Sequence, residues 1–392
     1  MYNRTVLELI KERLSWKKVV IIYGARQTGK TTLCKELIKF KGEENCIYLN
    51  CERASIKETL EKQNILEIIR MFQGKKFVVL DEAQVVTDIG RVLKIIYDTY
   101  PEYQLIATGS SAFDLNNRLS EPLTGRNIKY HLYPLSFKEM SNNLGTYQQA
   151  EMFDMLNDMI RFGAYPDIVG KPEAEAIEKL DYLAGDYLYK DILALDNLKK
   201  PALLRDLLKA LALQVGSEVN FHELAKLLNA TSDTIYRYID LLEKSFIIFK
   251  LDSFSRNMRN ELKKGFKVYF YDLGIRNGLL GDYKKVENRS DIGGLFENFC
   301  ILERKKQIQA NSEYGNSYFW RTYNPDKEID YIEERDGSLH TIEFKWNPKA
   351  SGNARLPKNF LDSYGQGIDD DGKSKNITFK VIDNSNWWQW LS

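Results

Sequence analysis

Five short apolar runs alternate with amphipathic stretches over the first 140 residues. The runs are rich in Val, Ile, Leu and Tyr, and they cover residues 19–23, 46–50, 77–80, 104–108 and 128–133. Strands that alternate with helices indicate a parallel sheet covered by helices on both faces. Ligands bind such sheets beyond the carboxyl ends of the strands, so we expect functional residues directly after these runs.

The middle of the chain, residues 141–285, is mostly helical in pattern. Two short helical segments, 220–229 and 233–242, are separated by a polar break. Two runs of strand character follow, at 246–250 and 267–271. This order predicts a helix-turn-helix followed by a hairpin, which is a winged helix.

The remainder of the chain, residues 286–392, begins with an amphipathic helix and continues with strands. The expected strands are 318–322, 328–333 and 339–346, and the Asp336–Gly337 dipeptide between the last two is typical of a tight hairpin turn. We therefore expect a second α/β domain here.

Composition limits the classes of protein. A length of 392 residues predicts two or three domains, which we place at 1–140, 141–285 and 286–392. The net charge of +1 gives no overall attraction to nucleic acid, so any such site must be a local patch. There is no apolar run of membrane-spanning length, no secretion signal and no cysteine spacing typical of zinc. We expect a cytoplasmic protein without a membrane partner.

A glycine-rich segment follows the first apolar run. Residues 24–31 match the phosphate-loop pattern G-x-x-x-x-G-K-T/S at every fixed position. Backbone N–H groups of such a loop and the start of the next helix face phosphate oxygens; Lys30 would reach the β- and γ-phosphates, and Thr31 would hold Mg²⁺. The alternative is a glycine-rich turn with an incidental lysine. We expect ATP and Mg²⁺ as cofactors, and the expected nucleotide contacts are Gly24, Ala25, Arg26, Gln27, Thr28, Gly29, Lys30, Thr31, Thr32 and Ser110.

Polar residues also follow the third and fourth runs. Asp81 would help to hold Mg²⁺, mostly through water, and Glu82 would act as the general base on the attacking water. Ser110, or its neighbour Ser111, would sense the γ-phosphate. The alternatives are a solvated acidic turn and a turn of small residues.

An arginine precedes the fifth run. Arg126 could reach the γ-phosphate in cis, or in trans from a neighbouring subunit of a homo-oligomer, and Arg118 is a second candidate. A surface arginine is the alternative for each.

Glu343 and Lys345 lie two residues apart in an expected strand, so they point to the same face. Asp330 on the adjacent antiparallel strand could oppose them. Glu343 and Lys345 are the expected catalytic residues: Asp330 and Glu343 would bind Mg²⁺, and Lys345 would orient the attacking water or stabilise the pentavalent phosphate. Cross-strand ion pairs are common and are the alternative.

The predicted winged helix suggests DNA as a partner. Arg237 would enter the major groove, and basic residues between the two strands would contact phosphates. These residues are Arg256, Arg259, Lys263, Lys264 and Lys267. The alternative is a packing or lid module that does not touch DNA.

The stretches GARQTGKTT, VVLDEAQ, ATGSSAF and LTGRNIKYHLYPLSFKEM resemble a widespread bacterial and archaeal family. Its members join an AAA-type P-loop ATPase domain to a C-terminal domain of uncharacterised function. The resemblance extends along nearly the whole chain and implies an extra strand between the two nucleotide-motif strands. Gln84, Arg26 and Gln27 also fit the family pattern.

The last domain resembles the PD-(D/E)XK nuclease fold, in which Glu297 would be the auxiliary acidic residue. The two resemblances together imply an ATPase coupled to DNA binding or cleavage. The alternative is a nucleotide-driven switch whose nuclease-like domain is inert and binds DNA or a protein.

Overall fold

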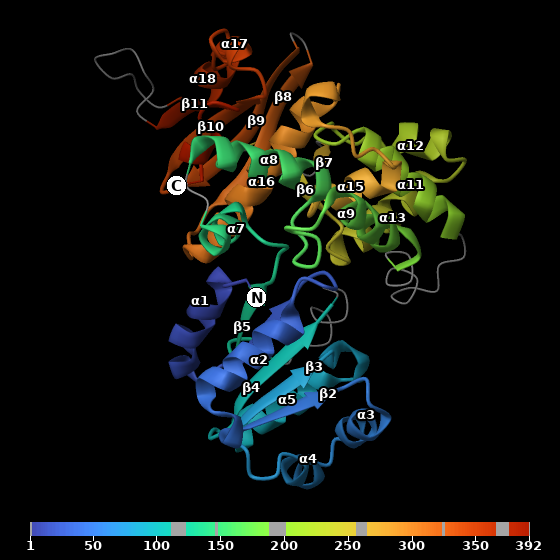
Figure 1. Ribbon diagram of the computed structural model, residues 1–392, viewed down its shortest axis with the longest axis vertical. Coiled ribbons are helices and arrows are strands. Elements are labelled where there is room, and N and C mark those ends of the chain that lie inside the picture. Colours follow the sequence, from blue (N-terminus) through green and yellow to red (C-terminus); the bar gives the residue numbers. More distant parts are fainter. Residues whose placement is uncertain are drawn as a thin grey trace.

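The computed structural model describes residues 2–110, 123–145, 148–187, 201–255, 265–323, 326–365 and 376–391. Figure 1 shows two bodies: a small one formed by the first 131 residues, and a larger one formed by the rest of the chain. The larger body joins a helical region to a second sheet. No helix in these described ranges is long and apolar enough to cross a membrane.

The small body contains a five-stranded parallel sheet in the order β2-β3-β4-β1-β5. The strands are β1 (Val19–Tyr23), β2 (Cys46–Asn50), β3 (Phe77–Asp81), β4 (Gln104–Gly109) and β5 (Asn127–His131). All five coincide with the expected runs to within two residues. Strand β4 lies between β1 and β3, which confirms the extra strand implied by the resemblance.

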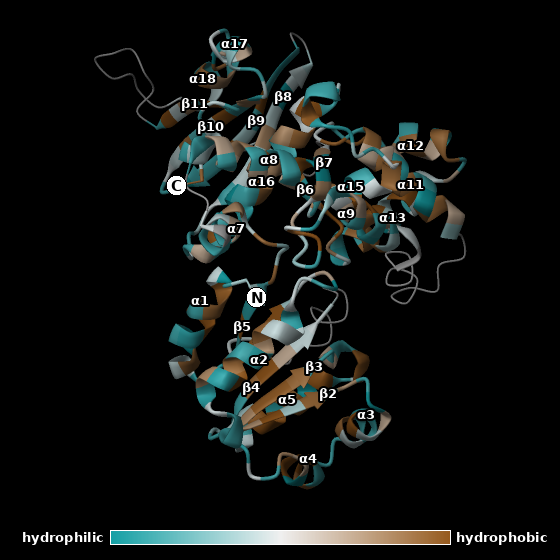
Figure 2. Ribbon diagram, viewed as in Figure 1, coloured by the Kyte–Doolittle hydropathy of each residue, from teal (hydrophilic) through white to brown (hydrophobic). Residues whose placement is uncertain are grey.

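Helices cover both faces of this sheet because successive strand residues point to opposite sides. Val20 and Ile22 pack under α1 and α2, while Val19 and Ile21 pack under α3, α4 and α5. Figure 2 shows the hydrophobic strands enclosed by these amphipathic helices. The elements are α1 (Thr5–Arg13), η1 (Leu14–Trp16), α2 (Lys30–Lys41), η2 (Glu43–Asn45), α3 (Ala54–Glu61), α4 (Ile65–Met71), η3 (Ala83–Val85) and α5 (Ile89–Thr99).

The helical region contains the expected pair of short helices. The side chain of Thr231 accepts a hydrogen bond from the backbone of Thr234 and so caps the second helix of the pair, α13. The elements are α7 (Phe137–Leu144), α8 (Gln149–Phe162), α9 (Glu173–Tyr182), the π-turn η4 (Leu183–Tyr187), α11 (Pro201–Leu213), α12 (Phe221–Leu227), α13 (Ser232–Lys244), α15 (Leu273–Leu280) and η5 (Val286–Asn288).

The second sheet has six strands in the order β11-β10-β9-β8-β6-β7. The expected β9–β10 hairpin is present, with positive φ angles at Asp336 and Gly337 in its turn. The elements are β6 (Ile248–Ser253), β7 (Phe266–Phe270), α16 (Ile292–Ala310), β8 (Asn316–Tyr323), β9 (Asp326–Arg335), β10 (Ser338–Lys345), α17 (Pro348–Ser351), α18 (Lys358–Tyr364), β11 (Ile377–Asp383) and η6 (Trp387–Gln389).

The β6–β7 hairpin, which we expected as a wing, belongs to this second sheet. Strand β6 pairs in parallel with β8 through Asp252–Tyr318 and Ser253–Phe319. Strands from both sides of residue 285 therefore share one sheet. A single hydrophobic core also runs from the helical region to the packed side chain of Trp387.

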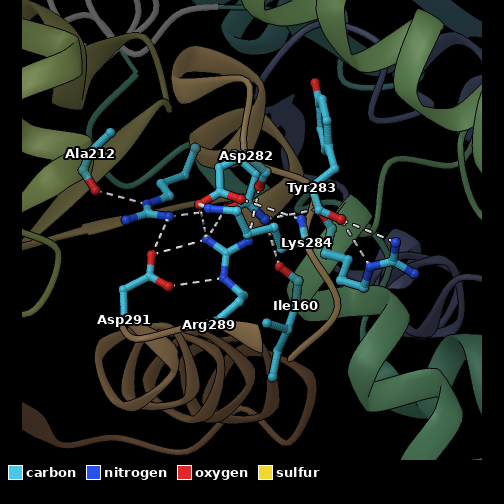
Figure 3. Close-up of polar contacts among 10 residues, drawn as sticks. Ile160, Ala212, Asp282, Tyr283, Lys284, Arg289 and Asp291 are labelled. Atoms are coloured by element: carbon cyan, nitrogen blue, oxygen red, sulfur yellow. Dashed lines mark hydrogen bonds and ion pairs between the residues drawn. The ribbon is translucent and has the colours of Figure 1, made fainter. Parts of the chain in front are cut away.

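A buried arginine junction fixes the start of α16 against the helical region (Figure 3). Arg289 donates to both carboxylate oxygens of Asp291 at 2.9 and 3.0 Å, and Arg276 lies 2.7 Å from the same carboxylate. Arg276 also donates to the carbonyl of Ala212 in α11, and Asn277 donates to two carbonyls near the end of α8. The shared carboxylate allows two like charges to pack together, and the junction connects α8, α11, α15 and α16.

Candidate functional site

The loop after β1 has the backbone geometry that its glycines permit. Gly24 has a φ of 155°, and a Cβ atom there would overlap the carbonyl oxygen of Leu132. Gly29 has a φ of 99° at the start of α2. Lys30 folds back into this loop and donates to the carbonyl oxygens of Gly24 and Ala25, both at 2.9 Å.

The loop lies directly beside the first acidic residue after β3. The hydroxyl of Thr31 donates to Asp81 at 2.8 Å, and the hydroxyls of Tyr48 and Thr108 donate to the same carboxylate. A hydroxyl and a carboxylate at hydrogen-bonding distance are oxygen ligands that suit Mg²⁺. Thr31 and Asp81 therefore fit the expected metal position.

The second acidic residue is joined to the end of β4. The backbone N–H of Glu82 donates to the hydroxyl of Thr108 at 3.0 Å, and Glu82 itself has a φ of 54°. The side-chain amide of Gln84 donates to Glu82 at 2.5 Å and to Ser110 at 3.2 Å. The structure thus brings Glu82 and Ser110 together. Ser111 and Arg118 lie outside the described residues.

A pocket of about 370 Å³ adjoins the loop. Thr28, Gly29 and Thr32 form one wall, and the N-terminal segment forms another. Within that segment, the guanidinium of Arg4 donates to the carbonyl of Thr28 at 2.9 Å and lies 3.3 Å from the carboxylate of Glu139 in α7. Sequence reasoning missed Arg4, since no motif surrounds it. Arg26 and Gln27 occupy the tip of the loop, where Gln27 is exposed.

Arg126 is at the wrong edge of the sheet for a role in cis. Its carbonyl accepts from the backbone N–H of Val19, the first residue of β1, whereas the phosphate loop follows the last residue of that strand. The guanidinium pairs with Asp98 at 2.7 Å. The expected contact of Arg126 with a γ-phosphate bound in its own chain is therefore wrong.

The three C-terminal candidates do come together. The ammonium of Lys345 lies 2.5 Å from Glu343 and 3.9 Å from Asp330. The side-chain carboxylate of Asp330 also accepts from the backbone N–H of Phe344 on β10 at 2.8 Å. These distances confirm the predicted proximity.

A second lysine enters this cluster from β7. Lys267, which we expected on an exposed basic wing, is only 1% exposed. Its ammonium pairs with Glu297 at 3.0 Å and with Glu328, and it lies 4.0 Å from Asp330. The expected phosphate contact of Lys267 is therefore wrong, because this buried ammonium is surrounded by carboxylates of its own chain.

Two further members of the cluster were also missed. Tyr269 donates to Glu297 at 2.5 Å from the same face of β7. Glu328 precedes Asp330 by two residues, so the period of a strand already placed both on one face. For Lys267 the sequence signal of membership in the cluster was weaker, namely a charged residue inside the apolar run of β7.

Burial dominates the electrostatics of this cluster. It raises the pKa of Glu297 to about 7 and also raises the pKa values of Asp330 and Glu343. Burial disfavours the charged form of Lys267, but Glu297, Asp330 and Glu328 outweigh it and raise the pKa of that ammonium. The two ammonium groups thus balance part of the negative charge of the four carboxyl groups around them.

The second cluster differs from the first in the cations that it already holds. The ammonium groups of Lys267 and Lys345 stand among the carboxylates that a cation would need. Asp330 and Glu343 thus form ion pairs here.

Comparison with known families supports the assignment of the small body. Residues 16–141 match a family model described as an AAA domain, which agrees with the parallel-sheet, P-loop fold of the small body. Residues 153–285 and 292–377 match two further models, both described as domains of unknown function. These matches thus describe a domain type for the first body alone.

Similar whole proteins are uncharacterised. A protein of Haemophilus influenzae is 27% identical over 349 residues, with 83% of this chain and 82% of the relative covered. A protein of Methanocaldococcus jannaschii is 26% identical over 343 residues, with 82% and 74% covered.

Two solved structures are similar at low sequence identity. The Walker-type ATPase of Pyrococcus abyssi aligns with a TM-score of 0.47 and 17% identity, and the alignment covers 71% of this chain and 96% of that one. The Thermotoga maritima RuvB Holliday junction branch migration motor aligns with a TM-score of 0.33 and 16% identity, with 65% and 94% covered.

Proposed function

We propose that the protein is a Mg²⁺-dependent ATPase whose nucleotide state acts as a switch on the larger body. The observation that carries the ATPase proposal is the meeting of Lys30, Thr31, Asp81 and Glu82 at the carboxyl edge of one parallel sheet. The adjoining pocket has room for the nucleoside part of ATP.

Each residue has a separate task in this proposal. Lys30 exchanges its loop carbonyls for phosphate oxygens, and the backbone of the loop binds the remaining charge. Mg²⁺, when bound near Thr31 and Asp81, would neutralise charge on the phosphates. Glu82 accepts the proton of the attacking water, and Ser110 contacts the γ-phosphate.

Direct contacts between the bodies support the switch. Tyr23, the residue before the loop, stacks on His131 with ring centroids 5.1 Å apart. His131 in turn contacts Phe246 at 4.5 Å and Tyr271 at 5.2 Å in the larger body. Arg4 joins the loop to Glu139. A nucleotide that moves the loop therefore acts on an interface with α7 and with the residues that precede β6 and follow β7.

The partner of the switch is DNA or a protein. The α12–α13 pair, with Arg237 on its second helix, supports DNA, whereas the burial of Lys267 removes one of the basic residues that favoured it. Retention on DNA that weakens steeply with salt would identify DNA. Retention independent of salt and of DNA would favour a protein.

Metal-dependent cleavage of DNA by the C-terminal cluster is the second candidate. The convergence of Asp330, Glu343 and Lys345 favours it, as does the resemblance to PD-(D/E)XK nucleases. Ion pairing of the same carboxylates with Lys267 and Lys345 favours an inert cluster, and we prefer the inert cluster for that reason.

ATP turnover tests the main proposal. We expect Mg²⁺-dependent hydrolysis by the parent protein, and Glu82→Gln should bind ATP normally but hydrolyse it about 10²–10³-fold more slowly. Glu58→Gln, an exposed change on α3, is the matched control. Turnover by Glu82→Gln at the parent rate would show that Glu82 is not the base, and failure of the parent to bind ATP would remove the proposal.

Cleavage of linear, supercoiled and single-stranded DNA separates the two candidates. With Mg²⁺ or Mn²⁺, and with or without ATP, we expect no cleavage by a preparation that hydrolyses ATP. Metal-dependent cleavage that disappears in Lys345→Ala would establish an ATPase-nuclease and overturn the inert cluster. Cleavage that persists in Lys345→Ala would indicate a contaminating nuclease.

A further inference from the structure

One side chain joins the two residues that face the γ-phosphate in the proposed function. The amide nitrogen of Gln84 lies 2.5 Å from Oε2 of Glu82 and 3.2 Å from Oγ of Ser110. We propose that Gln84 is a positioning residue that orients the general base and links it to the phosphate-sensing serine. This inference rests on the proposed ATPase function.

The backbone around Glu82 leaves the orientation of its carboxylate to Gln84. Glu82 has a φ of 54°, in the left-handed region, and its N–H is held by the hydroxyl of Thr108 on β4. The chain then enters the short η3 turn, in which the N–H of Val85 donates to the carbonyl of Glu82. The main chain is thereby fixed, and this turn carries the buried Gln84 side chain back to the carboxylate.

The chemistry suits orientation of a base. A carboxylate has two oxygens, and the amide of Gln84 engages Oε2, so that Oε1 is the atom we assign to the water proton. An ionised acceptor makes this hydrogen bond a strong one. A base must be held within hydrogen-bonding reach of its proton, and a third group commonly supplies that orientation.

The second hydrogen bond of the Gln84 amide, to Ser110, would connect the general base to the bound nucleotide. Ser110 directly follows Gly109, the last residue of β4, whose carbonyl accepts from the N–H of Gly24 at the start of the phosphate loop. When Ser110 turns its hydroxyl toward a γ-phosphate, the amide of Gln84 shifts with it and adjusts Glu82. Gln84 thus makes the base respond to the presence of the phosphate that is to be cleaved.

Two substitutions separate positioning from packing. Gln84→Glu keeps the shape but loses the donor, and Gln84→Ala loses both. We expect each to lower kcat about 10-fold or more while KM and ATP affinity stay within about two-fold, since orientation of the base matters after binding. A normal kcat in Gln84→Glu would overturn the proposal, even if Gln84→Ala lowers the melting temperature.

A double-mutant cycle tests the link itself. If one amide joins the two groups, Ser110→Ala combined with Gln84→Ala should lower kcat by no more than about two-fold beyond the worse single change. Multiplication of the two single effects would refute the link. Thr59→Ala on α3, combined with Gln84→Ala, is the additive control.

Different results would refute the proposed ATPase function and the proposed role of Gln84. If the parent binds no ATP or does not hydrolyse it, the proposed function fails. If the parent hydrolyses ATP and Glu82→Gln does not, while Gln84→Glu retains the parent kcat, then the role of Gln84 fails and the ATPase remains.

Discussion

Two buried lysines stand at the two clusters of this molecule, and their partners differ. Lys30, 5% exposed, donates to two backbone carbonyl oxygens of its own loop beside an open pocket. Lys267, 1% exposed, stands among the carboxylates of Glu297, Glu328 and Asp330. Both clusters combine lysine with acidic residues on strands of a sheet.

The difference lies in the source of the compensating charge. Backbone dipoles solvate a cation without neutralising it, and the two carbonyl oxygens that Lys30 contacts are groups of this kind. Carboxylates neutralise a cation, so the positive charge of Lys267 is balanced by the carboxylates around it and does not attract an anionic ligand. Residue types alone therefore do not separate a phosphate site from a structural ion-pair cluster.

Removal of the first lysine should have the largest effect on ATP binding. Lys30→Ala is expected to weaken ATP binding about 100-fold or more, equivalent to ~2.8 kcal/mol, because the charge held for phosphate is lost. A titration with a fluorescent ATP analogue measures this. Lys39→Ala, an exposed lysine on the same helix, should bind as the parent does. Unchanged affinity in Lys30→Ala would place the nucleotide elsewhere.

Removal of the second lysine should act on stability. Lys267→Met leaves Glu297, Glu328 and Asp330 without their shared ammonium, and we expect a loss of about 3–5 kcal/mol in the free energy of unfolding. Urea unfolding of the larger body measures it. The half-exposed Lys345→Met should cost clearly less. Equal losses in the two variants would contradict our distinction between them.

Asp272 extends the comparison of the two lysines to a carboxylate, because it is buried and accepts hydrogen bonds from backbone N–H groups. It accepts from Ala164 at 2.7 Å and from Ile275 at 3.1 Å, and burial raises its pKa to about 6. The folded pKa exceeds that of the unfolded chain, so the folded state binds the proton more tightly, and this contribution to stability falls as pH rises through about 6.

The substitution Asp272→Asn removes that titration. We expect it to cost about 1–3 kcal/mol at pH 4.5, because one backbone donor then meets an amide, and to cost less at pH 7.5. Urea unfolding at both pH values, with the exposed Asp362→Asn as control, measures the difference. A cost that grows with pH would show that backbone donors keep Asp272 ionised.

Arg126→Ala should have the smallest effect. Its guanidinium is exposed, pairs with Asp98 and lies at the far edge of the sheet, so kcat of dilute protein should stay within about two-fold. ATPase rates across a range of protein concentrations check this. A rate that rises with concentration in the parent but not in Arg126→Ala would restore the role in trans.

Local pattern predicted the elements whose partners are close in sequence. The strands of the first sheet, the phosphate loop and the β9–β10 register all depend on short-range signals: apolar runs, glycines and a two-residue turn. Even Arg126 could have been placed, because a residue before a parallel strand lies at its amino end.

Long-range pairing could not be read in the same way. Strand β6 pairs with β8 although the paired residues are more than sixty positions apart, and the sequence of neither strand indicates which strand it pairs with. Lys267 therefore looked like a basic wing residue, although the fold buries it among carboxylates from α16 and β9. Gln84 was visible in the sequence, but its two contacts depend on how η3 turns beside β4.

The shared sheet also sets an order for synthesis. The first sheet is complete once β5 ends at His131, whereas β6 and β7 remain without β8 until the ribosome has passed residue 316, and β11 ends at Asp383. Pairings between distant segments form slowly, and unpaired strand edges promote aggregation. The nascent chain thus exposes the unpaired edge of the β6–β7 hairpin for some time after its first sheet has formed, which makes this interval the stage at which aggregation is most favoured.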